Sequence, residues 1–265
     1  MFKASSRAFI LPSAGPSKTK NTIMHRYLWL LTFSFFVLTI SQLSAQTCKT
    51  NIYFIPGLGT DYRLFQHIEL NEQFDTHYVH YDLPAEGMSM EEYACQLAVQ
   101  IDTTQPFVLV GASLGGMLAT EMTEFMNPEK VIIMASAKCR QELPARYRVQ
   151  SRLPFYKWVS GKMIKGSTRM LQPIVEPDRN REKATFIQML KAKDPRFMKR
   201  TVAMIVTWKR ETCPESVVHI HGNKDHTIPI RNVDYDYQIE KGSHVMTLTR
   251  SKELSKIINQ ILAEI

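Results

Sequence analysis

Short apolar runs alternate with stretches of helical periodicity along most of the chain from residue 50 onward. Six runs have the length and composition of β-strands, at residues 51–55, 76–82, 107–111, 131–135, 217–221 and 236–240. Between such runs, and again at the C-terminus, apolar residues recur every three or four positions, as in residues 89–101 and 251–265. Continuous apolar strands separated by helices are typical of a parallel sheet covered by helices on both faces. We therefore predict an α/β fold with a mostly parallel central sheet flanked by helices.

A basic segment of helical character, residues 138–212, interrupts this alternation. It contains 19 Lys and Arg residues against 6 Asp and Glu, whereas residues 46–137 and 213–265 together contain 9 basic and 19 acidic residues. We interpret it as a helical cap inserted into one domain that spans residues 46–265. The positive charge of the cap has three possible meanings. It can form an ordinary solvated face, steer anionic substrates, or make weak contact with an anionic membrane surface. Its basic residues are not interleaved with aromatic ones, so we expect no nucleic-acid partner.

The first 45 residues are typical of a leader and secretory signal peptide. Two basic residues precede a 14-residue apolar run, Tyr27 to Ile40, and a polar segment ending at Ala45 follows it. A membrane-spanning helix needs about 20 apolar residues. We therefore expect export to the periplasm or the medium with cleavage after Ala45, and a retained N-terminal membrane tether is the alternative. Translation from Met1 and from Met24 both fit this pattern.

The four cysteines, Cys48, Cys95, Cys139 and Cys213, bear on compartment and on metal binding. An exported chain can form disulfides. Cys139 follows the fourth predicted strand and Cys213 precedes the fifth, which are opposite edges of a parallel sheet, so we expect these two not to pair. Other pairings remain open, as do four buried thiols. No Cys or His spacing resembles a metal site, and we expect neither a metal nor a cofactor.

One short motif, GASLG at residues 111–115, joins the third predicted strand to a helix. A sharp turn there would lift the Ser113 side chain above the carboxyl edge of the sheet, and Gly111 and Gly115 would leave room where strand and helix cross. This is the Gly-x-Ser-x-Gly nucleophile elbow. An unreactive serine in an ordinary strand–turn–helix connection is the alternative.

A serine hydroxyl needs a base, and the base needs an orienting acid. His244 lies in the loop between the last predicted strand and the final helix, from which it can reach across the top of the sheet. Asp225 follows the fifth strand in HGNKDHTIP. Asp234 and Asp236 are rivals, but they lie in or against the last strand. We expect His226, the neighbour of Asp225, to point elsewhere.

The loop after the first predicted strand, PGLG at residues 56–59, could supply an oxyanion hole. The backbone N–H groups of Leu58 and of Leu114, which follows the serine, would converge on a developing negative charge. An ordinary Pro-Gly turn is the alternative.

With GASLG, PGLG, HGNKDHTIP and GSH in this order, the chain resembles the α/β-hydrolase family over most of residues 50–265. The resemblance implies a triad of Ser113, His244 and Asp225, an acyl-serine intermediate that water clears, and a cap at residues 138–212. Pro56 stands where the family commonly has His. A serine nucleophile argues against relatives that use Asp, such as dehalogenases and epoxide hydrolases.

These features predict an exported serine hydrolase of a small to medium carboxylic ester or thioester. An aminopeptidase-like amide hydrolase is one alternative, and it would need an acidic pocket for the substrate amine. A non-catalytic protein that binds an apolar ligand under its cap is another. Large apolar residues of the cap either line an acyl pocket or pack the cap onto the sheet: Phe155, Trp158, Met163, Met170, Phe186, Met189, Met198 and Met204.

Overall fold

The computed structural model describes residues 49–152, 158–167 and 182–265. The expected signal peptide, Cys48, Phe155 and Met170 lie outside these residues. Within them, no helix is both long enough and apolar enough to cross a membrane.

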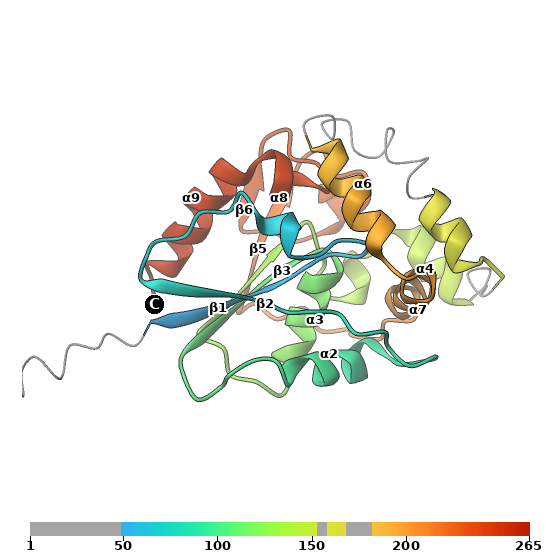
Figure 1. Ribbon diagram of the computed structural model, residues 1–265, viewed down its shortest axis with the longest axis horizontal. Coiled ribbons are helices and arrows are strands. Elements are labelled where there is room, and N and C mark those ends of the chain that lie inside the picture. The colour runs from blue at the N-terminus through green and yellow to red at the C-terminus, as the bar shows by residue number, and fades with distance from the viewer. Residues whose placement is uncertain (1–48, 153–157, 168–181) are drawn as a thin grey trace, which may run out of the picture. The chain divides into compact units, whose positions relative to one another are not determined.

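Six strands form one sheet in the order β2-β1-β3-β4-β5-β6, and every neighbouring pair is parallel. This confirms the predicted α/β fold (Figure 1). The strands are β1 (Thr50–Ile55), β2 (Phe74–Tyr78), β3 (Phe107–Ala112), β4 (Lys130–Met134), β5 (Val217–Gly222) and β6 (Tyr237–Ile239).

Burial along the strands follows their position in the sheet. All six residues of central β3 are buried, whereas edge strand β2 buries only Phe74 fully. The mixed exposure of β2 explains why its apolar pattern predicted residues 76–82, although the strand begins at Phe74 and ends at Tyr78. The other predicted strands agree with the structure to within one residue.

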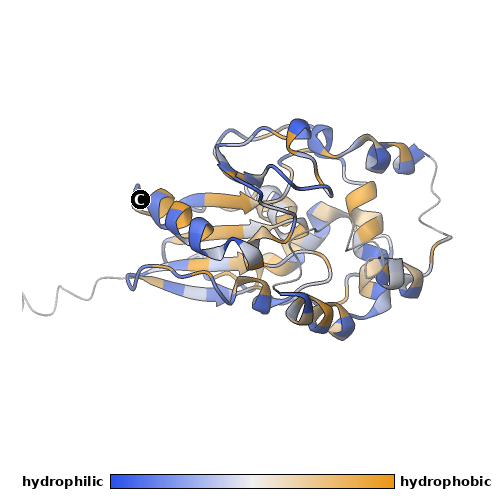
Figure 2. Cartoon of the chain, turned by 90° about the horizontal axis from the view of Figure 1, so that it is seen from above, coloured by the Kyte–Doolittle hydropathy of each residue, from blue (hydrophilic) through white to orange (hydrophobic). Residues whose placement is uncertain are grey.

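Helices cover both faces of the sheet. Figure 1 shows α2 (Met90–Ala98) and α3 (Leu114–Met122) on one face, and α8 (Met246–Thr249) and α9 (Ser251–Leu262) on the other. Helix α2 begins with a capping box in which Ser89 and Glu92 bond each other's backbone N–H groups. In Figure 2 the helix next to the C-terminus, α9, carries both orange and blue residues, as expected for a helix with one buried face.

Between β4 and β5 the chain forms the helices of the basic segment. These are α4 (Ala145–Arg152), a helical stretch at residues 161–167, α6 (Lys183–Ala192) and α7 (Pro195–Val206). Asp194 caps α7 by accepting the N–H of Arg196, and Pro195 occupies the first helical position. Met189 of α6 and Met198 and Met204 of α7 are buried, so these methionines pack the segment onto the rest of the fold.

The two stems of this segment run side by side. The backbone N–H of Arg140 donates to the Arg210 carbonyl oxygen at 2.8 Å, and the Arg140 guanidinium donates to the carbonyl oxygens of Val206 and Trp208. On the returning stem, the Trp208 indole N–H donates to Glu121 of α3 at 2.6 Å. The two stems at the base of the cap are therefore hydrogen-bonded to each other, and the returning stem is also bonded to α3, the helix after Ser113.

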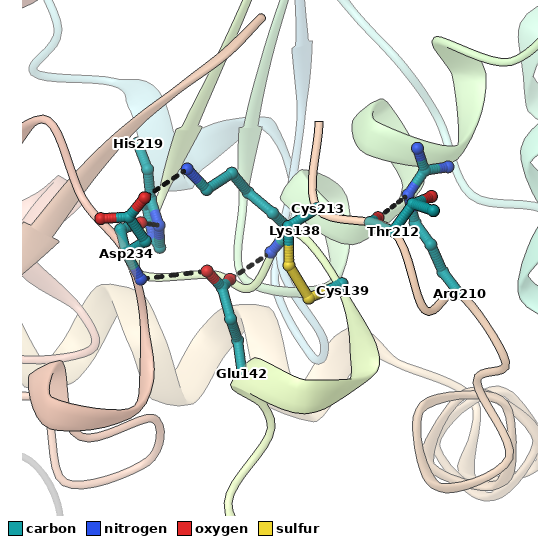
Figure 3. Close-up of a disulfide and its surroundings, with 8 residues drawn as sticks. All are labelled: Lys138, Cys139, Glu142, Arg210, Thr212, Cys213, His219 and Asp234. Atoms are coloured by element: carbon teal, nitrogen blue, oxygen red, sulfur yellow. Dashed lines mark hydrogen bonds and ion pairs between the residues drawn. A yellow bond between two sulfur atoms is a disulfide. The ribbon is translucent and has the colours of Figure 1, made fainter. Parts of the chain in front are cut away.

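A disulfide joins Cys139 to Cys213 across these stems, and it corrects our expectation that the two would not pair (Figure 3). The expectation placed the two cysteines at opposite edges of the sheet. However, Cys139 lies five residues beyond β4 and Cys213 four residues before β5. Four or five extended residues span roughly 13–17 Å, the height of a short strand, so both stems can bring their cysteines to one level.

Candidate active site

The backbone at Ser113 has the strained geometry expected of an elbow. Ser113 lies between β3 and α3 with φ of 52° and ψ of −119°, a region that residues other than glycine rarely adopt. Its N–H donates to the Met134 carbonyl oxygen at 2.9 Å. Holding such a residue costs on the order of 1–3 kcal/mol, which the surrounding structure must offset.

The two glycines of the motif allow that geometry. A Cβ atom at Gly111 would lie 2.4 Å from the carbonyl oxygen of Gly115, and one at Gly115 would lie 2.0 Å from that of Ile55. Both contacts are with backbone, which cannot move aside as a flexible side chain can. The requirement for two small residues, predicted from the motif, therefore has its cause in the crossing of β1, β3 and α3.

Three segments distant in the sequence bring Ser113, His244 and Asp225 together. The Nε2 atom of His244 lies 2.9 Å from Ser113 Oγ, and its Nδ1 atom lies 2.7 Å from Asp225 Oδ2. Ser113 follows β3, Asp225 follows β5, and His244 follows β6. Since carboxyl ends of parallel strands meet at one edge of a sheet, the topology produces this convergence.

The Asp225 carboxylate is buried and held at both oxygens. Oδ1 accepts the N–H groups of Thr227 and Ile228, each at 2.8 Å, and Oδ2 faces His244. Burial alone would raise the pKa of Asp225. The charge and hydrogen bond of His244, together with His221 and the Ile228 N–H, outweigh burial and hold that pKa below its ordinary value.

The two rival acids have other partners. Asp234 forms an ion pair with Lys138 at 3.8 Å, and Asp236 accepts the backbone N–H of His219 at 2.7 Å. The acid at hydrogen-bond distance from the His244 ring is Asp225, the residue that the sequence analysis favoured over these two.

The predicted oxyanion loop lies directly against the serine. A Cβ atom at Gly57 would lie 3.3 Å from Ser113 Cβ. The Gly57 carbonyl oxygen accepts the hydroxyl and the N–H of Thr60, and the Pro56 carbonyl oxygen accepts the Tyr81 hydroxyl. In a trans peptide the N–H points opposite to the C=O, so these bonds fix the direction of the Leu58 N–H. The Leu114 N–H is the first of α3 and has no acceptor within its own helix.

Ser136 also holds the elbow, and sequence reasoning missed it. Its buried hydroxyl donates to the Ser113 carbonyl oxygen at 2.7 Å. It follows Ala135, which has a φ of 47°, just beyond the end of β4. A small polar residue after a strand belongs to no motif, so the sequence offered no signal beyond position at the strand end.

A cavity of about 750 Å³ opens at Ser113 and His244. Its wall is mostly apolar and includes Leu58, Met117 and Phe186. Of the apolar cap residues considered in the sequence analysis, Phe186 lines this cavity. Met189, Met198 and Met204 are buried elsewhere, and Trp158 and Met163 are exposed.

Two polar features of the cavity wall matter for chemistry. His226 is exposed and is among the residues that line the cavity, whereas the imidazole at hydrogen-bond distance from Ser113 Oγ is that of His244. None of the described lining residues is Asp or Glu.

Across the described residues, no group of three or more His, Cys, Asp and Glu side chains could hold a metal ion.

The model of one protein family, described as the alpha/beta hydrolase family, matches residues 52–256. The chain belongs to this family. Solved α/β-hydrolase structures share its fold at low sequence identity. The malate-bound thermophilic esterase of Thermogutta terrifontis is 15% identical with a TM-score of 0.60, covering 81% of this chain and 90% of the esterase.

Two further α/β hydrolases give the same result. The enol-lactonase of Burkholderia xenovorans LB400 is 15% identical with a TM-score of 0.62, covering 81% of this chain and 92% of the lactonase. The esterase of Exiguobacterium antarcticum is 14% identical with a TM-score of 0.57, covering 81% of this chain and 92% of that esterase. No curated protein sequence matches the chain.

Proposed function

We propose that this α/β hydrolase is a serine esterase that cleaves a carboxylic ester or thioester through an acyl-serine intermediate. The observation that carries the proposal is the chain of hydrogen bonds from Ser113 Oγ through His244 to Asp225, at 2.9 and 2.7 Å, beside an apolar cavity. This is the arrangement that converts a weakly nucleophilic alcohol into an attacking group.

The three hydrogen-bonded residues Ser113, His244 and Asp225 have different roles in the proposed reaction. His244 Nε2 takes the proton of Ser113 Oγ as that oxygen attacks the acyl carbon, and then gives the proton to the departing alcohol or thiol. In the second half, His244 takes a proton from the water that attacks the acyl-serine, and it returns this proton to Ser113 Oγ as the bond to the acyl carbon breaks and the acid leaves. Asp225 holds the Nδ1–H tautomer of His244 and stabilises its charged form.

The negative oxygen of each tetrahedral intermediate would be held by the backbone N–H groups of Leu58 and Leu114. The loop bonds at Gly57 and Pro56 support this role because they orient the loop before substrate binds. The N-terminus of α3, which begins at Leu114, adds a partial positive charge at the same place.

The cavity supports a small to medium acyl substrate. Its volume of about 750 Å³ lies within the usual range for small-molecule sites, and its wall is largely apolar. The names of the esterase and enol-lactonase structures point to ester substrates. The described lining offers no carboxylate to receive an amine, so an aminopeptidase-like reaction has less support.

We also propose that the protein works outside the reducing cytoplasm, exported to the periplasm or the medium. Disulfides persist chiefly in oxidising compartments, and Cys139 pairs with Cys213. The apolar run at residues 27–40 is consistent with a secretory signal. Cell fractionation of the full chain, with N-terminal sequencing of the mature protein, tests this, and a cytoplasmic chain that keeps residues 1–45 would refute it.

A fluorophosphonate probe tests the central proposal, since it labels only an activated serine. We expect labelling of the wild type and none of Ser113→Ala. Hydrolysis of nitrophenyl esters of increasing chain length, with aminoacyl amides in parallel, then separates the alternatives. A folded wild type that neither reacts with the probe nor cleaves esters would favour a binding protein, and cleavage of amides alone would favour a peptidase.

A further inference from the structure

The proposed reaction leaves two buried histidines unused, and one of them, His221, lies 3.6 Å from the Asp225 carboxylate. His219 and His221 are two residues apart on β5, so their side chains lie on the same face of the sheet, and both are completely buried. Their rings meet edge to face with centroids 4.9 Å apart. Figure 3 shows His219 beside Asp234 and Lys138.

The two rings form a continuous chain of hydrogen bonds between two backbone carbonyls. His219 Nδ1 lies 3.0 Å from the Asp234 carbonyl oxygen, and His221 Nε2 lies 2.8 Å from that of Ile228. Between the rings, His219 Nε2 lies 3.0 Å from His221 Nδ1.

The three hydrogen bonds of this series need three hydrogen atoms on the ring nitrogens. A carbonyl oxygen only accepts, so His219 Nδ1 and His221 Nε2 must each carry a hydrogen. The nitrogen-to-nitrogen contact needs a third hydrogen. Two neutral imidazoles carry only two N–H groups, so a neutral pair leaves two lone pairs facing each other at one of the three contacts. Only a pair with one additional proton completes all three bonds.

Charged groups surround the pair from several elements. Asp225 Oδ2 lies 3.6 Å from His221 Nε2, and the Asp236 carboxylate accepts the backbone N–H of His219. Two groups oppose a positive charge on the histidine pair. Lys138, which pairs with Asp234, disfavours it on His219, and His244 disfavours it on His221. The Glu142 carboxylate accepts the backbone N–H groups of Lys138 and Asp234, and so lies next to that ion pair.

The pKa of each imidazole taken singly is lowered, that of His219 strongly, chiefly because burial disfavours the charged form. Two features act against burial: the three hydrogen bonds that only the singly protonated pair completes, and the neighbouring carboxylate of Asp225. A buried polar group left without a partner is costly, so a complete chain has a strong advantage over an incomplete one.

We propose that His219 and His221 share one additional proton, and that the resulting cation holds Asp225 ionised and in place to orient His244. The two histidines are thus positioning residues, one step removed from the reacting atoms. Their effect on His244 rests on the proposed function, whereas the shared proton does not.

Nuclear magnetic resonance of the folded wild type, labelled with ¹⁵N in the histidine rings, tests the proton directly. We expect three of the four ring nitrogens of His219 and His221 to carry hydrogen at neutral pH, with signals assigned from His219→Gln and His221→Gln. Only two protonated nitrogens would overturn the proposal. This result stands whether or not the chain is an esterase, so it separates the two proposals.

The pH profile of kcat/KM tests the effect on the triad. Removing a cation close to Asp225 makes protonation of His244 easier, so His221→Gln should move the acid limb of the profile upward by about one pH unit. At a fixed pH on that limb, the rate falls about tenfold. The control is His77→Gln on edge strand β2, whose ring contacts Asn51 at the surface and which should leave the limb in place.

A purely structural role predicts a different result. His221→Gln would then lower the stability of the fold, measured by urea unfolding, while the acid limb of the surviving activity stayed at the wild-type pH. An unmoved limb in a folded variant would overturn the positioning role even if the nitrogen count were three.

Discussion

The backbone of Gly115 lies so close to that of Ile55 that a Cβ atom at Gly115 would stand 2.0 Å from the Ile55 carbonyl oxygen. Ile55 ends β1 and leads directly into the PGLG loop, while Gly115 is in the first turn of α3. The candidate oxyanion loop and the nucleophile elbow are therefore packed backbone to backbone. A change at either one must displace the other.

Replacing Gly115 by Ala tests this packing. The added methyl group has only backbone to push against, so we expect Gly115→Ala to lower the free energy of unfolding by about 1–3 kcal/mol and to abolish most esterase activity. Urea unfolding and ester hydrolysis measure the two effects. The control is Gly166→Ala, where a Cβ atom would meet nothing within 4 Å. Wild-type activity in Gly115→Ala would refute the packing argument.

Replacing Asp225 by Asn tests the assignment of the acid. The amide keeps an acceptor for the N–H groups of Thr227 and Ile228 but loses the charge that stabilises protonated His244. We expect kcat to fall by roughly 10³- to 10⁴-fold in a folded protein, because an amide N–H facing His244 favours the wrong tautomer. The matched control is Asp234→Asn, whose exposed carboxylate pairs with Lys138 and which should change kcat little. Equal losses in both variants would contradict the assignment.

The low pKa of Asp225 predicts how its contribution to stability depends on pH. A carboxyl group whose pKa is lower in the folded than in the unfolded state adds stability above its unfolded pKa, near 3.8, and loses it as the pH falls through its folded pKa. Urea unfolding between about pH 3 and pH 5, where histidines are mostly charged in the unfolded chain, should show the gap between wild type and Asp225→Asn narrowing with acid. A constant gap would mean that the carboxylate is not the cause.

Cys139 and Cys213 close a loop with a sequence separation of 74 residues, which contains the whole cap. Joining such distant residues restricts the unfolded chain, so we expect the double variant Cys139→Ser/Cys213→Ser to lose about 2–4 kcal/mol of stability. Urea unfolding with and without a thiol reductant measures this, and reduction should have little effect on the double variant. Cys95→Ser is the control, since Cys95 is exposed and unpaired. Equal destabilisation by Cys95→Ser would argue against the disulfide.

The sequence predicted best those features that depend on local pattern and chain order. Buried strands appear in the sequence as continuous apolar runs. GASLG requires two small residues because backbone atoms occupy the space that a Cβ at Gly111 or Gly115 would need. His244 and Asp225 were favoured because parallel topology places strand ends together, and the structure brings both side chains to the Ser113 side of the sheet. Edge strand β2 was placed less well, because a half-exposed strand has a weaker apolar signal.

Features that depend on how the cap folds back could not be predicted in this way. The pairing of Cys139 with Cys213 depends on the path of two short stems, which no periodicity records. Ser136 acts through a single hydroxyl, and the proton shared by His219 and His221 depends on the positions of two carbonyl oxygens. Each of these is a distance between segments far apart in the sequence.

Phe186 of α6 is one of several apolar cap residues that line the cavity, and it offers a test of acyl-chain selection. Removing its ring enlarges the apolar space, and each additional buried methylene is worth about 0.8 kcal/mol, or roughly fourfold in kcat/KM. Phe186→Ala should therefore raise kcat/KM for an ester longer by two methylenes, relative to the shorter one, by about fifteenfold. Phe186→Leu gives a smaller shift and keeps more of the packing of the cap.

The control for this test is Met163→Ala, because Met163 is exposed and lies outside the cavity wall. It should leave the preference for acyl length unchanged. If Phe186→Ala remained folded with an unchanged preference, the acyl group would have to lie elsewhere than against α6. The apolar cavity beside Ser113 would then hold the leaving group, and variants of Met117, on the wall formed by α3, would become the next test.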